Sequence, residues 1–153
     1  MRNSYWLLLL MVFVVGADNF AQAQAPQEGY GKMALPGGCV YEGQFKNGVF
    51  EGLATMSCDD GREYKGEFKD GLYDGRGVLT YTDGSKYEGQ FKEGLPNGQG
   101  GITYADGGSF KGQFRYGVID GRGVATYYGG AKYKGQFKDG EAVVTNSTAD
   151  PAP

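Results

Sequence analysis

The side chains that could support catalysis in this chain are carboxylates and two thiols, because the sequence contains no histidine. This absence excludes histidine-based triads, most zinc sites and the commonest general base. Aspartates recur mainly at turn positions between strand-like segments, where Asp bonds to its own backbone. They are Asp59, Asp60, Asp74, Asp83, Asp106 and Asp120. We interpret them as turn residues; the alternative is a paired-carboxylate active site.

Glycine pairs such as Gly75 and Gly77 could cradle a phosphate. No Gly-x-Gly-x-x-Gly or Walker sequence precedes a helix in this chain, so we interpret these residues as packing glycines. The sequence therefore predicts no catalytic residues, no cofactor and no metal, and we expect a protein that is not an enzyme.

The elements that position these residues come from a tandem repeat. One phrase occurs five times, and each occurrence begins 23 residues after the previous one. The occurrences are YEGQFKNG from Tyr41, YKGEFKDG from Tyr64, YEGQFKEG from Tyr87, FKGQFRYG from Phe110 and YKGQFKDG from Tyr133. A fixed period indicates one supersecondary unit that buries its apolar face against its neighbours. We predict a half-repeat at 29–40, full repeats at 41–63, 64–86, 87–109 and 110–132, and a partial repeat at 133–144.

Each repeat predicts an antiparallel β-hairpin, so the expected fold is all-β. The opening phrase alternates apolar or glycine residues with polar ones, which is the period of a half-buried strand. The residues of this buried pattern are Tyr41, Gly43, Phe45, Tyr64, Gly66, Phe68, Tyr87, Gly89, Phe91, Phe110, Gly112, Phe114, Tyr133, Gly135 and Phe137. In the second full repeat we expect a loop at 70–74, a return strand at 75–81 and an Asp-Gly turn at 82–84.

Folding the first full repeat about its loop predicts a register. It places Phe45 opposite Gly52, Gly43 opposite Ala54, and Tyr41 opposite Met56. Glycines on the same face as the rings would leave room for the phenylalanines to stack across repeats. Burial of a Phe contributes roughly 1.5–3 kcal/mol, more than the roughly 0.5–1 kcal/mol that a strand glycine costs.

The YxGxF alternation, the GxG return strand and the DG turn at this period resemble the MORN repeat family over residues 29 to about 140. The resemblance implies an elongated, twisted array of β-hairpins with a groove along it. It also implies a role as a scaffold, a self-association surface or a phospholipid contact. Three residues depart from the pattern: Ala54 replaces a return-strand glycine, Cys58 replaces a tyrosine, and Pro96 falls in the expected loop of the third full repeat.

The two cysteines, Cys39 and Cys58, fall opposite each other in the predicted register. In an oxidising compartment such a cross-strand pair is expected to close, adding roughly 3 kcal/mol of stability. We therefore predict a disulfide, with two buried free thiols as the alternative. A catalytic thiol is disfavoured because no histidine could activate it.

The N-terminus predicts export. Arg2 precedes an apolar segment at 5–15, and Ala21-Gln22-Ala23 fits the small-x-small rule for signal peptidase. The segment is shorter than the roughly 20 residues that span a bilayer, which disfavours the alternative of a retained anchor. We expect a signal peptide at 1–23, a linker at 24–28 and a disordered tail at 145–153. The mature protein would be periplasmic or secreted.

Two sets of surface residues could bind a partner. The first is a basic row formed by Lys46, Lys69, Lys92, Arg115 and Lys138. Polar or acidic residues follow most of its members, so we favour a solvated, edge-protecting row over an anion or headgroup site. The second set comprises Tyr73, Tyr81, Tyr104 and Tyr127, which we interpret mainly as core, with a groove for peptide or glycan stacking as the alternative.

These features predict a non-catalytic scaffold that presents its repeat surface for protein binding or self-assembly. A homodimer through the terminal repeats would pair unprotected strand edges. The alternative is a module that binds phospholipid headgroups or a cell-envelope glycan. The formal charge of −3 with interleaved signs gives no indication of a nucleic-acid partner.

Overall fold

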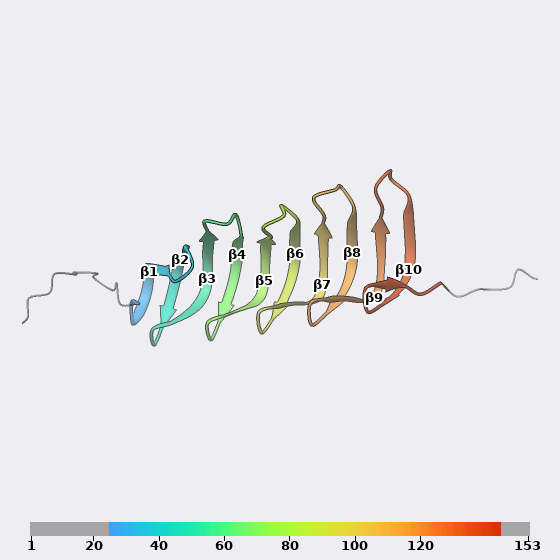
Figure 1. The fold of residues 1–153 in the computed structure, drawn as a ribbon. Helices are drawn as coiled ribbons and strands as arrows, with labels where there is room; N and C mark the ends of the chain where they lie inside the picture. Colours follow the sequence, from blue (N-terminus) through green and yellow to red (C-terminus); the bar gives the residue numbers. More distant parts are fainter. Residues whose placement is uncertain (1–24, 145–153) are drawn as a thin grey trace, which may run out of the picture.

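The structure is a computed structural model that describes residues 25–144. The expected signal peptide, its cleavage site before Gln24 and the expected tail at 145–153 lie outside the described residues. Eleven strands pair antiparallel in sequence order to form one open sheet. Figure 1 shows the hairpins following one another along a single axis. Within residues 25–144 there is no helix long and apolar enough to cross a membrane. The predicted all-β array of hairpins is thus confirmed.

The strands are of two kinds that alternate along the sheet. Outgoing strands carry the YxGxF phrase; they are β2 (Cys39–Lys46), β4 (Glu63–Lys69), β6 (Lys86–Lys92), β8 (Ser109–Arg115) and β10 (Lys132–Lys138). Return strands are β1 (Glu28–Leu35), β3 (Val49–Cys58), β5 (Leu72–Thr80), β7 (Leu95–Thr103) and β9 (Val118–Thr126). The short β11 (Glu141–Ala142) begins a sixth return strand.

Two-residue turns join each outgoing strand to its return strand, and we call the side of the sheet where they lie the turn edge. In the second full repeat the turn is Asp70-Gly71, with φ of 49° and 83°. Positive φ at both residues gives the local twist that matches a right-handed β-hairpin. The expected loop at 70–74 was therefore wrong, because β5 already begins at Leu72.

A β-bulge in each of the first four of these hairpins reconciles the short turn with the register of the glycines. The predicted pairs Gly43–Ala54 and Tyr41–Met56 are present, but Phe45 lies opposite Phe50 rather than Gly52. The register shifts after Gly43, and Gly52 instead lies opposite Phe68 of the next repeat. The expected Phe45–Gly52 pair was wrong because a bulge adds residues to the return strand.

Polar groups on the outgoing strand stabilise the bulge. In the second full repeat, Glu67 Oε1 accepts a 2.9 Å hydrogen bond from the Arg76 amide just after the bulge glycine. The Glu67 carbonyl accepts another from the Tyr64 hydroxyl at 2.9 Å. Gln90 and Gln113 accept equivalent bonds from Gln99 and Arg122. The bulge is therefore a recurring feature with its own hydrogen-bond partners.

The core is a line of aromatic rings on one face of the sheet, which we call the aromatic face. Tyr41, Tyr64 and Tyr87 are completely buried. Each packs edge-on against the phenylalanine of the next repeat; for Tyr64 and Phe91 the ring centroids are 5.1 Å apart. Such edge-to-face pairs add stability beyond the area they bury. The core therefore joins each repeat to its neighbour.

The glycines leave room mainly for the tyrosines. A β-carbon on Gly77 would lie 2.4 Å from the Tyr64 hydroxyl oxygen, and one on Gly123 would lie 2.3 Å from Phe110 Cζ. The predicted register was wrong in placing each phenylalanine opposite a glycine of its own hairpin. Each phenylalanine does face a glycine, but on the return strand of the preceding repeat, as Phe68 faces Gly52.

Candidate functional site

The turn edge is a rigid, regularly spaced surface. The amide of each turn glycine donates a hydrogen bond to a carbonyl of the preceding hairpin, as Gly71 does to Phe50 at 3.0 Å. The preceding amide can also be held by an acidic side chain, as Glu51 Oε2 holds Asp70 at 3.2 Å. These bonds fix successive turns relative to one another, so side chains beside them form ordered rows.

The basic row lies on the turn edge, on the face opposite the aromatic core, which we call the polar face. Each member is the last residue of its outgoing strand, and all are exposed. An aliphatic residue lies directly opposite each of the first four members: Lys46–Val49, Lys69–Leu72, Lys92–Leu95 and Arg115–Val118. This aliphatic row, Val49, Leu72, Leu95 and Val118, is 41–49% exposed.

Sequence reasoning missed the aliphatic row because these residues were assigned to a loop. The signal that could have found it was the two-residue turn, which makes the residues after Asn-Gly, Asp-Gly or Glu-Gly part of a strand. In a strand they must share a face with the basic residue across the turn. The turn edge thus combines positive charge with apolar surface over four consecutive hairpins.

Ion pairing within the basic row differs along the array. Lys138 Nζ contacts the Asp120 carboxylate and lies 3.7 Å from Asp139. The hydrogen bond to Asp120 raises the pKa of Lys138 and lowers the pKa of Asp120. Within the described residues, the other four basic side chains make no such ion pair. The acidic residues next to them in sequence lie in the turns, so the charge of those four is available to a partner.

Tyr116 is the most unusual residue of the turn edge. It occupies the first turn position, with a φ of 47°, where the other repeats carry Asn47, Asp70, Glu93 and Asp139. A positive φ is costly for most side chains and less so for Asn and Asp. The Tyr116 side chain is nevertheless 66% exposed and immediately follows Arg115 of the basic row. An exposed aromatic at a strained position is a candidate binding residue.

Four of the six aspartates considered for catalysis lie in turns, whereas Asp74 and Asp120 lie within β5 and β9, so their assignment to turns was wrong. Asp60, Asp83 and Asp106 each accept a hydrogen bond from the amide two residues later, at 2.8–3.0 Å. These bonds lower the pKa of the Asp60 and Asp83 carboxyls. Asp74 instead holds the amide of Glu93, at 3.4 Å. Across residues 25–144, no cluster of at least three His, Cys, Asp or Glu side chains could hold a metal ion.

The tyrosines proposed for a groove divide into two groups. Tyr73 belongs to the core, where it stacks on Tyr64 with ring centroids 3.8 Å apart. Tyr81 is also partly buried against the core, whereas Tyr104 and Tyr127 are 40% and 52% exposed. These last two lie at the edge opposite the turn edge, so the structure does not bring them together with the basic row.

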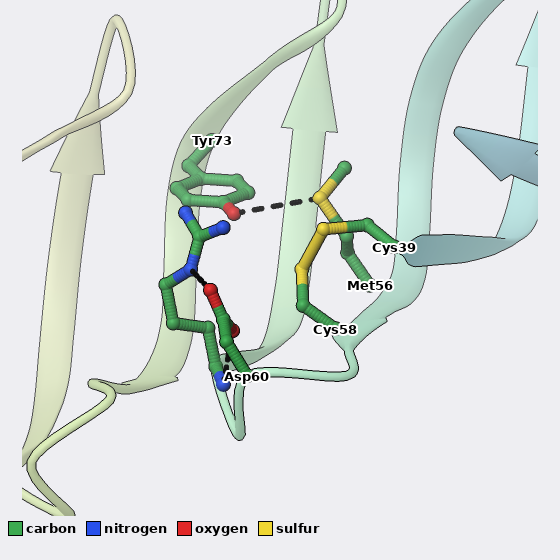
Figure 2. A network of polar contacts seen from close by, with 6 residues as sticks. Cys39, Met56, Cys58, Asp60 and Tyr73 are labelled. Atoms are coloured by element: carbon green, nitrogen blue, oxygen red, sulfur yellow. Dashed lines mark hydrogen bonds and ion pairs between the residues drawn. A yellow bond between two sulfur atoms is a disulfide. The ribbon is translucent and has the colours of Figure 1, made fainter. Parts of the chain in front are cut away.

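Cys39 and Cys58 form a disulfide between β2 and β3, with Cα atoms 3.9 Å apart. They lie directly opposite each other in the pairing of these strands. Figure 2 shows the bridge beside Met56, whose sulfur accepts a 3.7 Å contact from the Tyr73 hydroxyl of the next hairpin. The disulfide thus fastens the first hairpin close to where the second packs on it.

The repeat that positions these rows matches the family model of the MORN repeat at 41–61, 64–86, 87–109, 110–132 and 133–144. The chain belongs to the MORN repeat family. MORN repeats are interaction modules, and the surface expected to act in this chain is therefore a binding surface. A search of curated proteins found no significant match.

Proposed function

We propose that this MORN chain is an exported, non-catalytic scaffold whose turn edge binds an acidic segment of a partner protein. The observation that carries the proposal is the pairing of each basic residue with an exposed aliphatic one, four times at a fixed spacing. Two strands per hairpin at about 4.8 Å each set these pairs roughly 10 Å apart. A partner with regularly spaced acidic and apolar side chains would match this surface.

The packing of the aliphatic row favours a protein over insertion into a bilayer. Val49 lies against the turn of the next hairpin, since a β-carbon on Gly71 would be 3.4 Å from Val49 Cγ1. Leu95 is placed similarly beside Gly117. Side chains that lie along the sheet rather than projecting from it offer a shallow apolar strip, which suits an extended peptide. Tyr116 and Arg115 would be the strongest contacts, because Tyr and Arg are the residues that most often dominate interfaces.

The test is a pull-down from native envelope extract with the mature chain as bait, washed at low and high salt. The double substitution Lys69→Gln and Lys92→Gln should weaken capture roughly tenfold at low salt, because it removes two unpaired charges from the interface. The matched control is Lys86→Gln with Lys111→Gln, which makes the same charge change on the polar face away from the turn edge. Equal loss in both variants would contradict a site at the turn edge.

The same rows support a second candidate, an anionic phospholipid surface. Exposed cations beside aliphatic side chains are the chemistry by which proteins bind anionic membranes. Flotation with vesicles that contain phosphatidylglycerol would distinguish the two candidates. Binding that needs Lys69 and Lys92 and is lost at high salt would replace the protein partner with a lipid surface. Salt-insensitive enrichment of envelope glycan would instead favour stacking on the exposed tyrosines.

Export rests on the N-terminal sequence and is supported by the disulfide, which persists in oxidising compartments. Mass spectrometry of the protein from its native cells should find the N-terminus at Gln24. A mature chain that retains Arg2 and the apolar segment at 5–15 would contradict signal-peptide cleavage, and a chain found in the cytosol would contradict export.

A further inference from the structure

We propose that the chain assembles head to tail, with β1 of one molecule pairing with β10 of the next so that the repeat continues across the junction. The proposal uses the two ends of the sheet, and of the turn-edge rows it involves only Lys138, which is already ion-paired with Asp120. The function proposed above and this assembly can therefore fail independently.

β1 has the local structure of a return strand that lacks its outgoing partner. Gly29 has a φ of 86° at the position of the bulge glycines, and Glu28 accepts a 3.0 Å hydrogen bond from the Asn47 amide as Glu51 does from Asp70. Gly31 lies opposite Gly43 of β2, as Gly77 lies opposite Gly89 in the array interior. On its other side β1 has no neighbouring strand within residues 25–144.

β10 is the converse, an outgoing strand with only the start of a return strand. β11 pairs with Phe137 and Lys138 alone, and beyond it the Val143 amide donates to the Gln136 carbonyl at 2.8 Å. That bond shows that the Gln136 backbone faces the free edge. Because this direction alternates along a strand, the Lys134 backbone faces the free edge too. Within residues 25–144 the first strand is thus a return strand, and the last full-length strand is an outgoing one followed only by the two residues of β11, so the two edges are complementary.

The glycine pattern fixes the register of the junction. Continuing the repeat places Gly31 opposite Gly135 of the second molecule and Met33 opposite its Tyr133. Tyr133 is only partly buried in the single chain, whereas its equivalents Tyr64 and Tyr87 are completely buried. In the assembly its ring would lie over Gly31, as Tyr64 lies over Gly77. Burial of this ring supplies an apolar contribution in addition to the backbone hydrogen bonds.

Two short segments occupy the junction in the single chain and must move. Pro26 lies over Gly31, since a β-carbon on Gly31 would be 2.3 Å from Pro26 Cγ. At the other end, Glu141 and Ala142 pair where residues 26 and 27 of the incoming molecule would pair. Displacing the second segment breaks its pairing with β10 and the bond from the Tyr133 hydroxyl to the Val143 carbonyl, and the incoming strand restores the pairing. A head-to-tail contact leaves the β1 edge of one molecule and the β10 edge of the other free, so the assembly can elongate.

One charge pair opposes assembly and provides a sharp test. The register places Lys32 opposite Lys134 of the second molecule, although the interior equivalents of Lys32 are the uncharged Thr55, Val78, Gly101 and Val124. Like charges directly opposite across strands are destabilising. Lys32 is held near Glu42, at 3.4 Å, which offsets part of this repulsion. Added salt should therefore strengthen assembly rather than weaken it.

The experiment is sedimentation equilibrium of the purified mature chain over a range of concentrations and salt. Lys32→Glu and Lys134→Glu should each strengthen association several-fold, because either creates an opposite-charge pair at the junction. The double variant should return to weak association, because the two glutamates then face each other. Gly31→Val should abolish association, since its side chain occupies the place of the incoming Tyr133 ring, while circular dichroism verifies that the variant is folded.

Comparison of the two single charge variants with the double variant tests the proposed register even if the unaltered chain associates weakly. Failure of both single charge variants to associate more strongly than the unaltered chain would overturn the proposal. Association of Gly31→Val at the level of the unaltered chain would overturn it as well. Enhancement by both single variants with reversal in the double variant would support it, because only this register brings the two positions together.

Discussion

The ring of Tyr87 lies directly over Gly100, where a β-carbon would come within 2.3 Å of the Tyr87 hydroxyl oxygen. The neighbouring Gly101 faces the other way, and a β-carbon there would meet only the Phe110 carbonyl oxygen at 3.4 Å and Lys111 Cγ at 4.0 Å. Adjacent glycines therefore have opposite structural roles. One makes room for the core, whereas the other occupies a position where other repeats carry Val78 and Val124.

We predict opposite effects of valine at these two glycines. Gly100→Val should lower the free energy of unfolding by about 3 kcal/mol, because the Tyr87 ring is displaced from a packed core. Gly101→Val should raise it by about 0.5–1 kcal/mol through better strand propensity and lower chain entropy. Urea denaturation of both variants is the measurement. Similar destabilisation by the two changes would contradict the assignment of faces.

Phe110 provides a natural comparison for the tyrosine hydroxyls. Tyr64 and Tyr87 each donate a 2.9 Å hydrogen bond to the carbonyl three residues later, a donor that Phe110 lacks. Phe110→Tyr should therefore stabilise the protein by about 1 kcal/mol, through a bond to the Gln113 carbonyl, and Tyr87→Phe should cost about the same. Thermal unfolding of the two variants tests this pair. A destabilising Phe110→Tyr would show that its pocket has no room for the hydroxyl.

The buried tyrosines should make the protein sensitive to alkali. Burial raises the pKa of Tyr64, and it raises the pKa of Tyr87 to about 12, from an ordinary value of 10.0. The folded state holds these protons more tightly, so their contribution is complete below pH 10 and is lost as pH rises toward 12. Urea midpoints should fall over that range. The Tyr64→Phe, Tyr87→Phe double variant should show a shallower fall, and an unchanged slope would exclude these hydroxyls as the cause.

Much of this fold could be predicted from the sequence because each repeat specifies the same hairpin. A 23-residue period, alternation at Tyr41, Gly43 and Phe45, and glycines in the return strand suffice for an open array. The register at Cys39–Cys58 followed from the same alternation. These features are local or repeat identically, so neighbouring repeats provide the same information several times.

The bulge could have been predicted as well, but only by combining two signals. An Asp70-Gly71 turn pairs Lys69 with Leu72, whereas the glycine pattern pairs Gly66 with Gly77. Both pairings hold only if the return strand contains extra residues between them. If 70–74 is interpreted as a loop, the two pairings no longer disagree and no bulge is needed. Leu72 is then not assigned to a strand, and the aliphatic row is not recognised. The proposed edge pairing of β1 and β10 could not be inferred from single repeats, because it depends on which strands lie at the two edges of the described sheet.

The disulfide should stabilise one end of the array more than the rest. Cys39 and Cys58 close a loop of sequence separation 19, for which the chain-entropy model gives roughly 3 kcal/mol. Replacing both by serine should therefore increase hydrogen exchange in β1–β3 far more than in β6–β9, since each repeat contacts mainly its neighbours. Exchange measured by mass spectrometry would show this gradient. Uniform loss of protection along the chain would indicate that the array unfolds as a single unit.

Tyr116 separates the requirements of stability from those of binding. Its backbone has a φ of 47°, which asparagine adopts at lower cost, as Asn47 does in the equivalent turn. Tyr116→Asn should raise the free energy of unfolding by about 0.5–1 kcal/mol, because it relieves this strain without removing a buried side chain. The same variant should capture less of the partner protein, because it removes the exposed ring beside Arg115. Denaturation and the envelope pull-down measure the two effects on one protein. Asp70→Asn is the matched control, since it changes an equivalent turn position without removing a ring. If Tyr116→Asn gains stability but captures the partner protein as before, the Tyr116 ring has no role in recognition.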